Sequence, residues 1–449
     1  MASLIILFIP LVVLMFFSLY EFKYIFSPAF SITIGFALQI FFCFFYVDEW
    51  NINLSVVTIG VVLLGCSCFV ITSWILASAR IKVVIGNKGR YTKNSRYSYD
   101  APTPFVVETW KLVLFFVVQT LTLLGYVIFM NSHMQGANIA AKVYYYRSMT
   151  ADYGKRIEIP LFLSFFRLLS SATGYCLLYI FAYNFANKFK VHRIWNSILT
   201  LANLLLSLLI EGILGARGGM FNFIVAFFAL YLFLSYKYGR LSVSFRLLFK
   251  YFMYGVAIIL MLPVLGNALG RPMTNGALYD IAFYIGGPLV NLDTFIKTQN
   301  VSKIRHFSTM YNIFLDFQDY FGDEFVAAQK LPIRWNFING NTTGNVYTAF
   351  ANYWYDNSWV GVIFWSCMAA IIMHFICKKL MLTSYDDNQV SISGVLFAYF
   401  LPCIMFSFFT NRFFVQIFSL YLIKFIIAVV VVAIFIERVS FVRPKFIRT

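Results

Sequence analysis

The sequence predicts an all-α polytopic membrane protein, and two features of its composition and patterning carry that prediction. Of the 449 residues, 61% are hydrophobic and only 12% are charged, whereas a soluble domain needs far more polar surface. Apolar runs of about 18 or more residues recur along the chain, and each is long enough to cross the ~30 Å hydrocarbon core as a helix. A third observation, the distribution of basic residues, gives the orientation.

We expect about 11 membrane-spanning helices. The first run lacks the basic segment and the cleavage site of a signal peptide, so it is expected to be retained as a helix. The predicted spans are residues 3–20, 28–46, 54–78, 112–131, 161–183, 194–213, 219–236, 252–268, 358–377, 391–409 and 414–436.

The basic residues place the N-terminus outside and the C-terminus inside. With that orientation the inner segments hold 21 basic and 6 acidic residues, and the outer segments hold 13 and 12. This asymmetry follows the positive-inside rule. The formal net charge of +17 therefore reflects topology and contact with anionic lipids. Nucleic-acid binding is not expected, because the basic residues are scattered over short loops without a recognisable module.

Residues 1–449 are expected to form one integral membrane domain with three long soluble segments. Segment 79–111 is an inner basic loop, and segments 132–160 and 269–357 are large outer loops. In the last loop, "LYDIAFYIGGPLVNLDTFI" and "MYNIFLDFQDYFGDEF" have helix-like apolar spacing, which predicts amphipathic helices on the outer membrane surface. No internal repeat is present, although many secondary transporters have two related halves. All seven cysteines fall within spans and are expected to be buried apolar residues.

A charged, glycine-rich stretch, "EGILGARGGMF" at residues 211–221, separates two uncharged runs. Its glycines permit a tight turn on the outer side, so the N-terminus of the next span faces outward. A helix N-terminus attracts anions, Gly218 and Gly219 let a bulky anion approach the backbone, and Arg217 adds a guanidinium suited to phosphate. The stretch predicts a phosphate or pyrophosphate site. A plain hairpin whose arginine reaches lipid phosphates is the equal alternative.

A second short outer turn, "TNRFF" at residues 410–414, places Arg412 beside another inward-running helix, or anchors that helix at the interface. Two further residues are candidate bases. Glu211 either pairs with Arg217 or accepts a proton, and His306 is either a general base or an ordinary surface histidine. The four histidines lack metal-ligand spacing and no phosphate-binding glycine motif is present, so neither a metal nor a cofactor is expected.

The end of the long loop, "NGNTTGNVYTAFANYWYDNSW", is rich in amide and aromatic side chains. Amides can hydrogen-bond sugar hydroxyls, and aromatic faces can stack on sugars. Tyr347, Tyr353 and Trp354 are therefore candidate sugar contacts, and an interfacial aromatic belt is the alternative interpretation.

Three stretches resemble the Wzy-type O-antigen polymerases, also called oligosaccharide repeat unit polymerases. "GILGARGGMFNFIVAFFALYLF" resembles their arginine-glycine turn and following helix, and "FFTNRFF" resembles the arginine turn before their last helix. "NVYTAFANYWYDNSWVGVIF" is similar to their stretch between the large outer loop and the next span. There Asp356 stands in the acidic position, Asn357-Ser358-Trp359 replaces a glycine-bearing turn, and Gly361 follows.

The resemblance implies a GT-C-like glycosyltransferase in the bacterial inner membrane, with large periplasmic loops, a periplasmic N-terminus and a cytoplasmic C-terminus. Such an enzyme transfers a growing glycan from undecaprenyl pyrophosphate to the sugar of another lipid-linked repeat unit. The implied partners are these lipid-linked oligosaccharides, the lipid bilayer, a chain-length regulator and a flippase of the same pathway.

For the site, the resemblance implies that Arg217 and Arg412 stabilise the leaving pyrophosphate. His306, Glu211 and Asp356 are then the candidate bases, and the outer-loop arginines Arg147, Arg271, Arg305 and Arg334 are candidates for holding sugar or a second pyrophosphate. Three alternatives stay open: an O-antigen ligase of the same fold, a lipid-linked oligosaccharide flippase, and a membrane scaffold. The dominant outer loop and the few deep charges favour an enzyme over a flippase.

Overall fold

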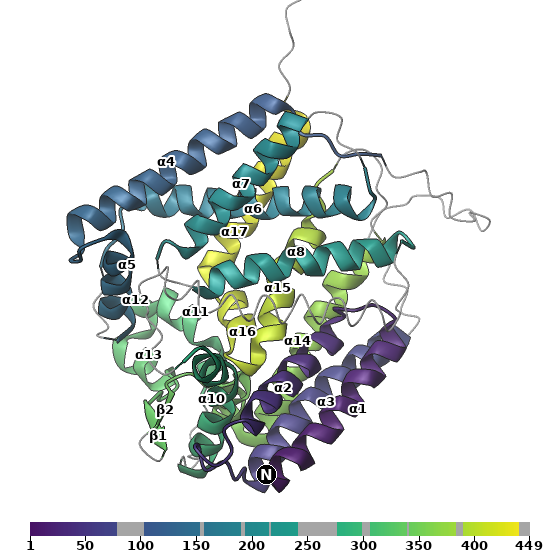
Figure 1. Cartoon of the computed structure of the whole chain (residues 1–449), viewed down its shortest axis with the longest axis vertical. Helices are drawn as coiled ribbons and strands as arrows, with labels where there is room; N and C mark the ends of the chain where they lie inside the picture. Colours follow the sequence, from purple (N-terminus) through teal and green to yellow (C-terminus); the bar gives the residue numbers. More distant parts are fainter. Residues whose placement is uncertain are drawn as a thin grey trace, which may run out of the picture.

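The computed structural model describes residues 1–78, 103–152, 157–189, 194–214, 217–240, 276–298, 306–338, 341–382 and 389–439. These residues are mostly helical, which confirms the all-α class (Figure 1). Within them, eight helices are long and apolar enough to cross a membrane, and two shorter apolar helices occupy two further predicted spans. The remaining predicted span, 252–268, lies outside the described residues.

The long apolar helices begin and end close to the predicted boundaries. They are α1 (Ala2–Phe22), α3 (Val56–Ser78), α4 (Thr109–His133), α6 (Leu161–Ala186), α7 (Ile194–Gly212), α8 (Arg217–Lys237), α14 (Ala349–Leu382) and α17 (Leu420–Arg438). The shorter pair is α2 (Pro28–Phe44) and α15 (Ile392–Met405), the latter extended by the 3₁₀ turn η3 (Phe406–Phe408). The last predicted span, 414–436, is divided, because α16 (Arg412–Ile417) ends before Ser419 caps the start of α17.

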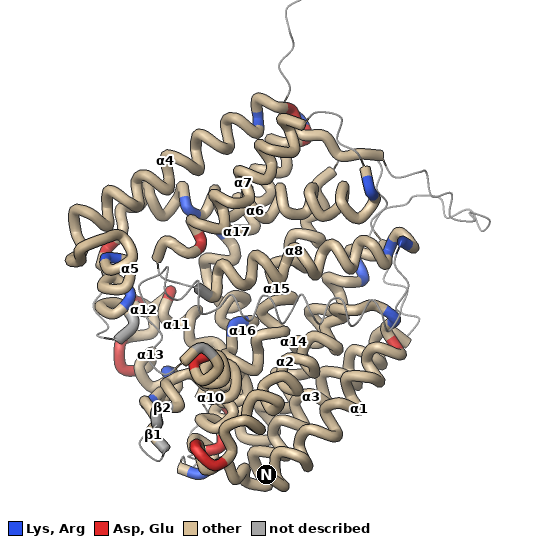
Figure 2. The backbone as a smooth tube through the Cα atoms, viewed as in Figure 1, with Lys and Arg blue, Asp and Glu red and all other residues tan. Residues whose placement is uncertain are grey.

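Smaller elements gather at one end of the helices, which we call the loop end. They are α5 (Ile139–Arg147), the π-helical turn η1 (Ser148–Asp152), α10 (Ala277–Thr298), η2 (Ser308–Met310), α11 (Tyr311–Asp316), α12 (Gln318–Phe321), α13 (Asp323–Gln329), and the antiparallel strands β1 (Asn336–Ile338) and β2 (Asn341–Gly344). In Figure 1, α5, α12, α13 and the two strands lie on the left of the long helices. Lys, Arg, Asp and Glu are sparse along the long helices and lie mainly near their ends and in the loops (Figure 2).

The opposite end, which we call the far end, is fastened by side chains that bond to the backbone of neighbouring helices. The Nζ of Lys111, at the start of α4, donates to the carbonyl oxygen of Ile436 near the end of α17 at 2.7 Å. The Nζ of Lys237, the last residue of α8, donates to the carbonyl oxygen of Leu380 near the end of α14 at 2.6 Å. Because the last carbonyls of a helix have no intrahelical partner, both lysines satisfy groups that would otherwise need water.

Helix α10 is buried, although its sequence predicted an amphipathic helix on the membrane surface. Its two central glycines explain the difference. A Cβ at Gly286 would lie 3.0 Å from the Trp50 ring, and a Cβ at Gly287 would lie 2.9 Å from the carbonyl oxygen of Thr343. The small residues therefore admit the end of α2 on one side and β2 on the other.

The polar residues of α10 are used within the protein. The Asp293 carboxylate accepts from the backbone N–H of Ser55 at 2.8 Å and from the Thr58 hydroxyl at 2.7 Å, which caps the start of α3. The Asn291 amide donates to the carbonyl oxygens of Thr343 and Val346, each at 2.8 Å. The apparent polar face of α10 is thus a set of tertiary contacts.

The second predicted amphipathic helix is divided into η2 and the short helices α11, α12 and α13. The backbone changes direction at Phe317, and at Gly322 it adopts φ = 84°, a conformation that favours glycine. The apolar residues of this stretch therefore belong to several short helices at the loop end, and not to one long helix.

Helix α14 is kinked where the predicted span begins. Asn357 and Ser358 leave helical geometry, and Ser358 has φ = 49°. Just beyond the kink, a Cβ at Gly361 would collide with the carbonyl oxygen of Tyr353 on the preceding turns. Gly361 therefore permits the close approach of the two parts of α14.

Gly361→Ala is expected to lower the free energy of unfolding by about 1–3 kcal/mol, because the new methyl group meets backbone that cannot move aside. Thermal unfolding of the purified protein in detergent would measure the loss. Ser358→Gly is the matched control at the same kink, and it should be tolerated because glycine adopts positive φ without strain. Equal melting temperatures for wild type and Gly361→Ala would show that the kink is not tightly packed.

Candidate functional site

The turn between α7 and α8 meets the turn before α16. A Cβ at Gly218 would collide with the Arg412 guanidinium, so this guanidinium lies directly over Gly218 at the start of α8. Asn222, one turn further along α8, donates to the carbonyl oxygen of Gly218 at 3.2 Å in the amide orientation that satisfies both of its groups. Its oxygen then accepts from Nη1 of Arg412 at 3.1 Å. The two turns that the sequence singled out separately are therefore one structural unit.

Arg217 is the first residue of α8, so its backbone belongs to the helix N-terminus. Its side chain lies outside the described part of the structure. The first backbone N–H groups of a helix lack carbonyl partners within the helix, and they give this end a partial positive charge. Arg412 thus adds a full positive charge to a position that is already electropositive.

Glu211, near the end of α7, lies against the same helix start. A Cβ at Gly219 would be 3.1 Å from Oε2 of Glu211 and 3.3 Å from its carbonyl oxygen, so Gly219 lets α8 begin close to the end of α7. Among the described residues, neither of the two ion pairs within 4.0 Å includes Glu211. The predicted pairing of Glu211 with Arg217 involves a side chain outside the described part of the structure, so it stays a prediction.

Arg167, which the sequence did not single out, is a second arginine of this site. It lies in α6, and its electrostatic neighbours are Glu211, Tyr421, Tyr126 and Tyr146. Its Nε is buried and has no hydrogen-bond partner in the part of the chain that the structure describes. The pKa of the Tyr146 phenol, on α5, is raised by burial, and the nearby positive charge of Arg167 opposes that rise.

Two tyrosines connect the parts of the site. The ring of Tyr175 has both Glu211 and Arg412 among its electrostatic neighbours, and Tyr421 has Glu211 and Arg167. Four helices, α6, α7, α8 and α16, thus bring charged or polar groups to one place. We call this set the charged cluster, and its members are Arg167, Glu211, Gly218, Asn222 and Arg412.

The segment 306–316 of the long loop lies over α16 and the start of α17. The Asn312 amide donates to the carbonyl oxygen of Val415 at 3.0 Å, and the Asp316 carboxylate accepts from the backbone N–H of Leu420 at 2.7 Å. The helix that carries Arg412 is thereby attached to the long loop.

Asp356 fastens the other side of this segment. Its carboxylate accepts from the backbone N–H and the hydroxyl of Ser308, at 2.6 and 2.7 Å, and from the backbone N–H of Thr309 at 3.2 Å. The side chain is buried. The acidic residue predicted as a base therefore ties the long loop to α14 just before the kink, and its oxygens already accept hydrogen bonds.

His306 lies on the same segment. Its ring is stacked on Tyr355, with the centroids 4.2 Å apart, and its Nδ1 is 3.2 Å from the carbonyl oxygen of Ala328. Because a carbonyl can only accept, the proton of this hydrogen bond lies on Nδ1. His306 belongs to the segment that Asn312 attaches to α16.

The aromatic residues predicted to contact sugars are buried. The Tyr347 hydroxyl accepts from Nδ2 of Asn336 and donates to the carbonyl oxygen of Arg334, both at 3.0 Å, which attaches the loop to the β-hairpin. Tyr353 packs edge-on against Phe414, and Trp354 packs edge-on against a neighbouring tryptophan of α14. Exposed aromatic side chains lie nearby at Trp335, Phe337 and Trp359, which are 54%, 66% and 40% exposed.

The four loop arginines do not all fall within the described residues. Arg334 is exposed just before β1, and Arg147 lies half-buried in the last turn of α5. Arg271 and Arg305 lie outside the described residues. The structure therefore describes positions for Arg147 and Arg334 alone among the four.

The chemistry of the site is that of an anion-binding centre beside a carboxylate. Two guanidinium groups and a helix N-terminus outweigh the charge of one glutamate in this cluster, a composition that favours a ligand with negative charge. The described residues contain no group of three or more His, Cys, Asp or Glu suited to a metal ion. No protein family, curated protein or solved structure matches this chain.

Proposed function

We propose that the protein is a glycosyltransferase of the O-antigen polymerase type, and that the charged cluster binds the pyrophosphate of its lipid-linked donor. The observation that carries the proposal is the position of the Arg412 guanidinium over Gly218 at the start of α8. Only a residue without a side chain permits this approach. This approach places the positive charge of the guanidinium beside the free backbone N–H groups at the start of α8.

The charge balance of the cluster supports an anionic ligand. Arg167 and Arg412 together carry one more charge than Glu211 can offset, and a buried guanidinium without an ionic partner is costly in a low-dielectric site. A pyrophosphate supplies the missing negative charge, and arginine binds phosphate oxygens through two parallel hydrogen bonds. Because the cluster lies among apolar helices, the pyrophosphate of a lipid carrier suits it better than a free anion.

The proposed reaction forms a glycosidic bond at the donor sugar. A hydroxyl oxygen of the acceptor sugar attacks the anomeric carbon, and the bond from that carbon to the pyrophosphate oxygen breaks. The electron pair leaves with the pyrophosphate, whose growing negative charge Arg412, Arg167 and the N-terminus of α8 stabilise. The hydroxyl proton goes to a base. The candidates are Glu211 within the cluster and His306 on the segment 306–316 of the long loop.

The proposed location is the bacterial inner membrane, with the loop end in the periplasm. The distribution of basic residues in the sequence supports this orientation. The donor and acceptor are undecaprenyl-pyrophosphate-linked oligosaccharides, and a chain-length regulator and a flippase are the proposed partners in the pathway. The proposed architecture is GT-C-like, for which the many apolar helices and the large loop end are the support.

A bacterial strain lacking this protein is expected to make lipid A core that carries a single repeat unit. Without polymerisation, each lipid-linked unit reaches the core unextended. Gel electrophoresis of the lipopolysaccharide would show one band above the core in place of a ladder, and a plasmid carrying the wild-type chain should restore the ladder. A core without any repeat unit would contradict polymerisation and favour an O-antigen ligase or a flippase.

A further inference from the structure

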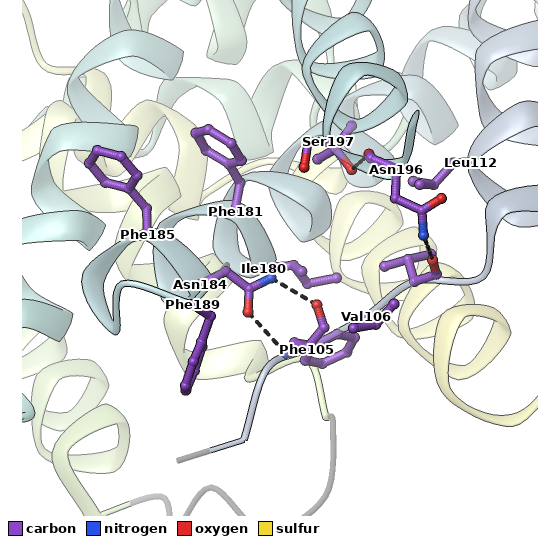
Figure 3. Close-up of a pocket in the computed structure, with 12 residues that line it drawn as sticks. Phe105, Val106, Leu112, Ile180, Phe181, Asn184, Phe185, Phe189, Asn196 and Ser197 are labelled. Carbon is purple, nitrogen blue, oxygen red and sulfur yellow. Dashed lines mark hydrogen bonds between the residues drawn. The ribbon is translucent and has the colours of Figure 1, made fainter. Parts of the chain in front are cut away.

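An apolar cavity of about 220 Å³ lies at the far end of the bundle (Figure 3). Its walls come from the C-terminal part of α6, the first turns of α7 and the extended segment 105–107 before α4. Asn184 of the lining is roughly 25 Å along α6 from Arg167, given a rise of 1.5 Å per residue. The cavity is therefore separate from the charged cluster and has no part in the proposed reaction.

The two asparagine side chains of the lining form hydrogen bonds within the protein. The Asn184 amide donates to the carbonyl oxygen of Phe105 at 2.7 Å and accepts from the N–H of the same residue at 2.9 Å. The Asn196 amide donates to the carbonyl oxygen of Val107 at 3.1 Å and accepts from the Thr109 hydroxyl at 2.7 Å. Figure 3 shows how the two asparagines tie the extended segment to both helices.

The lining of the cavity is mainly apolar. Phe181 and Phe185 come from α6, and Phe189 from the turn after it. Phe105 comes from the segment that the asparagines hold, and Leu112 from the start of α4. With its amides engaged, such a lining favours an apolar chain over a polar metabolite.

The surroundings of the cavity face the membrane. Trp195 is 73% exposed at the start of α7, next to the lining residues Asn196 and Ser197, and exposed tryptophans are typical of the membrane–water interface. Phe185 of the lining is also exposed. Lys188 is exposed one residue before Phe189, and its backbone N–H donates to the carbonyl oxygen of Phe185 at 3.1 Å. A basic residue is thus exposed next in sequence to a residue that lines an apolar cavity.

We propose that this cavity holds one acyl chain of a phospholipid whose anionic headgroup pairs with Lys188. The chain fills the space between α6 and α7, and the phosphate lies at the level of the exposed Trp195. Basic residues at a helix end attract anionic headgroups, and burying an acyl chain removes apolar surface from water. The bound lipid completes the packing of the far end without contacting the charged cluster.

Native mass spectrometry of the full-length protein tests this site. After delipidation, the protein would be offered phosphatidylglycerol or phosphatidylcholine with the same acyl chains. Wild type is expected to retain one phosphatidylglycerol molecule, and Ser197→Phe, which fills the cavity, should lower that retention at least about tenfold. The matched control is Ile198→Phe, on the neighbouring exposed residue that does not line the cavity, and it should retain the lipid as wild type does.

A second measurement keeps the proposal testable should Ser197→Phe fail to fold. A phosphatidylglycerol with a photoreactive acyl chain should cross-link wild-type protein within residues 180–200, and Lys188→Gln should reduce the preference for phosphatidylglycerol. Equal lipid retention by Ser197→Phe and Ile198→Phe would overturn the cavity as the site. Equal retention of both phospholipids by wild type would overturn the pairing with Lys188, and cross-links spread over other helices would indicate a general lipid shell.

Discussion

Arg412→Ala is expected to reduce polymer formation by about 100- to 1,000-fold, the usual cost of removing one donor to a developing negative charge. Arg412 lies over Gly218 at the N-terminus of α8 and is held there by the Asn222 amide. Its loss removes the described guanidinium that is closest to the helix start. Arg412→Lys should recover part of the activity, since an ammonium group keeps the charge but not the planar pair of donors.

The measurement is the rate of polymer formation by purified protein supplied with a lipid-linked repeat unit, together with the lipopolysaccharide ladder in cells. The matched control is Arg438→Ala, which removes an exposed arginine at the far end of α17 and should leave the rate unchanged. Melting temperatures would establish that both variants are folded. A ladder of normal length from folded Arg412→Ala protein would refute the assignment of Arg412 to the leaving pyrophosphate.

Gly218→Ala is expected to reduce activity by about 10- to 100-fold while changing stability little. The new methyl group would occupy the place of the Arg412 guanidinium, the mobile end of a long side chain that can swing away. The protein should therefore fold with Arg412 displaced, and a displacement of about 1 Å is enough to cost about 100-fold in rate. This contrasts with Gly361→Ala, where the obstacle is backbone.

A double-mutant cycle shows whether Gly218→Ala lowers activity by displacing Arg412 or by an independent effect. If Gly218→Ala acts through Arg412, the combined variant Gly218→Ala/Arg412→Ala should be no less active than Arg412→Ala alone. Independent effects would instead multiply, so the double variant would be slower by the product of the two factors. A lowered melting temperature in Gly218→Ala equal to that of Gly361→Ala would mean that Gly218 serves packing rather than the site.

The positions of the helices could be predicted well from the sequence, because apolar run length is a local property. The two arginine-containing turns could also be identified from the sequence, because a glycine-flanked arginine between uncharged runs is conspicuous. Arg167 and Asn222 were missed for different reasons. Arg167 is the single charge in the apolar run 161–183, a signal that should have been followed. Asn222 looks like any polar residue of a helix, and its role exists only because Arg412 lies beside it.

The long loop could not be predicted in detail, because amphipathic spacing does not say what covers each face. In α10 the apolar face, the glycines and the polar side chains all meet protein, so periodicity alone suggested a surface helix. Tyr347, Tyr353 and Trp354 look like sugar contacts in a loop rich in amides, but their rings are buried. Asp356 matched an expected acidic position, and its hydrogen bonds to Ser308 and Thr309 were invisible because almost 50 residues separate the partners.

The lysine bonds at the far end have a consequence for how mutations are tolerated. Lys111 joins α4 to α17, and Lys237 joins α8 to α14, so each ammonium group forms a hydrogen bond that connects two helices. Replacing either lysine therefore removes a bond between two helices at once. We expect such replacements to be poorly tolerated although both residues lie at the far end, away from the charged cluster.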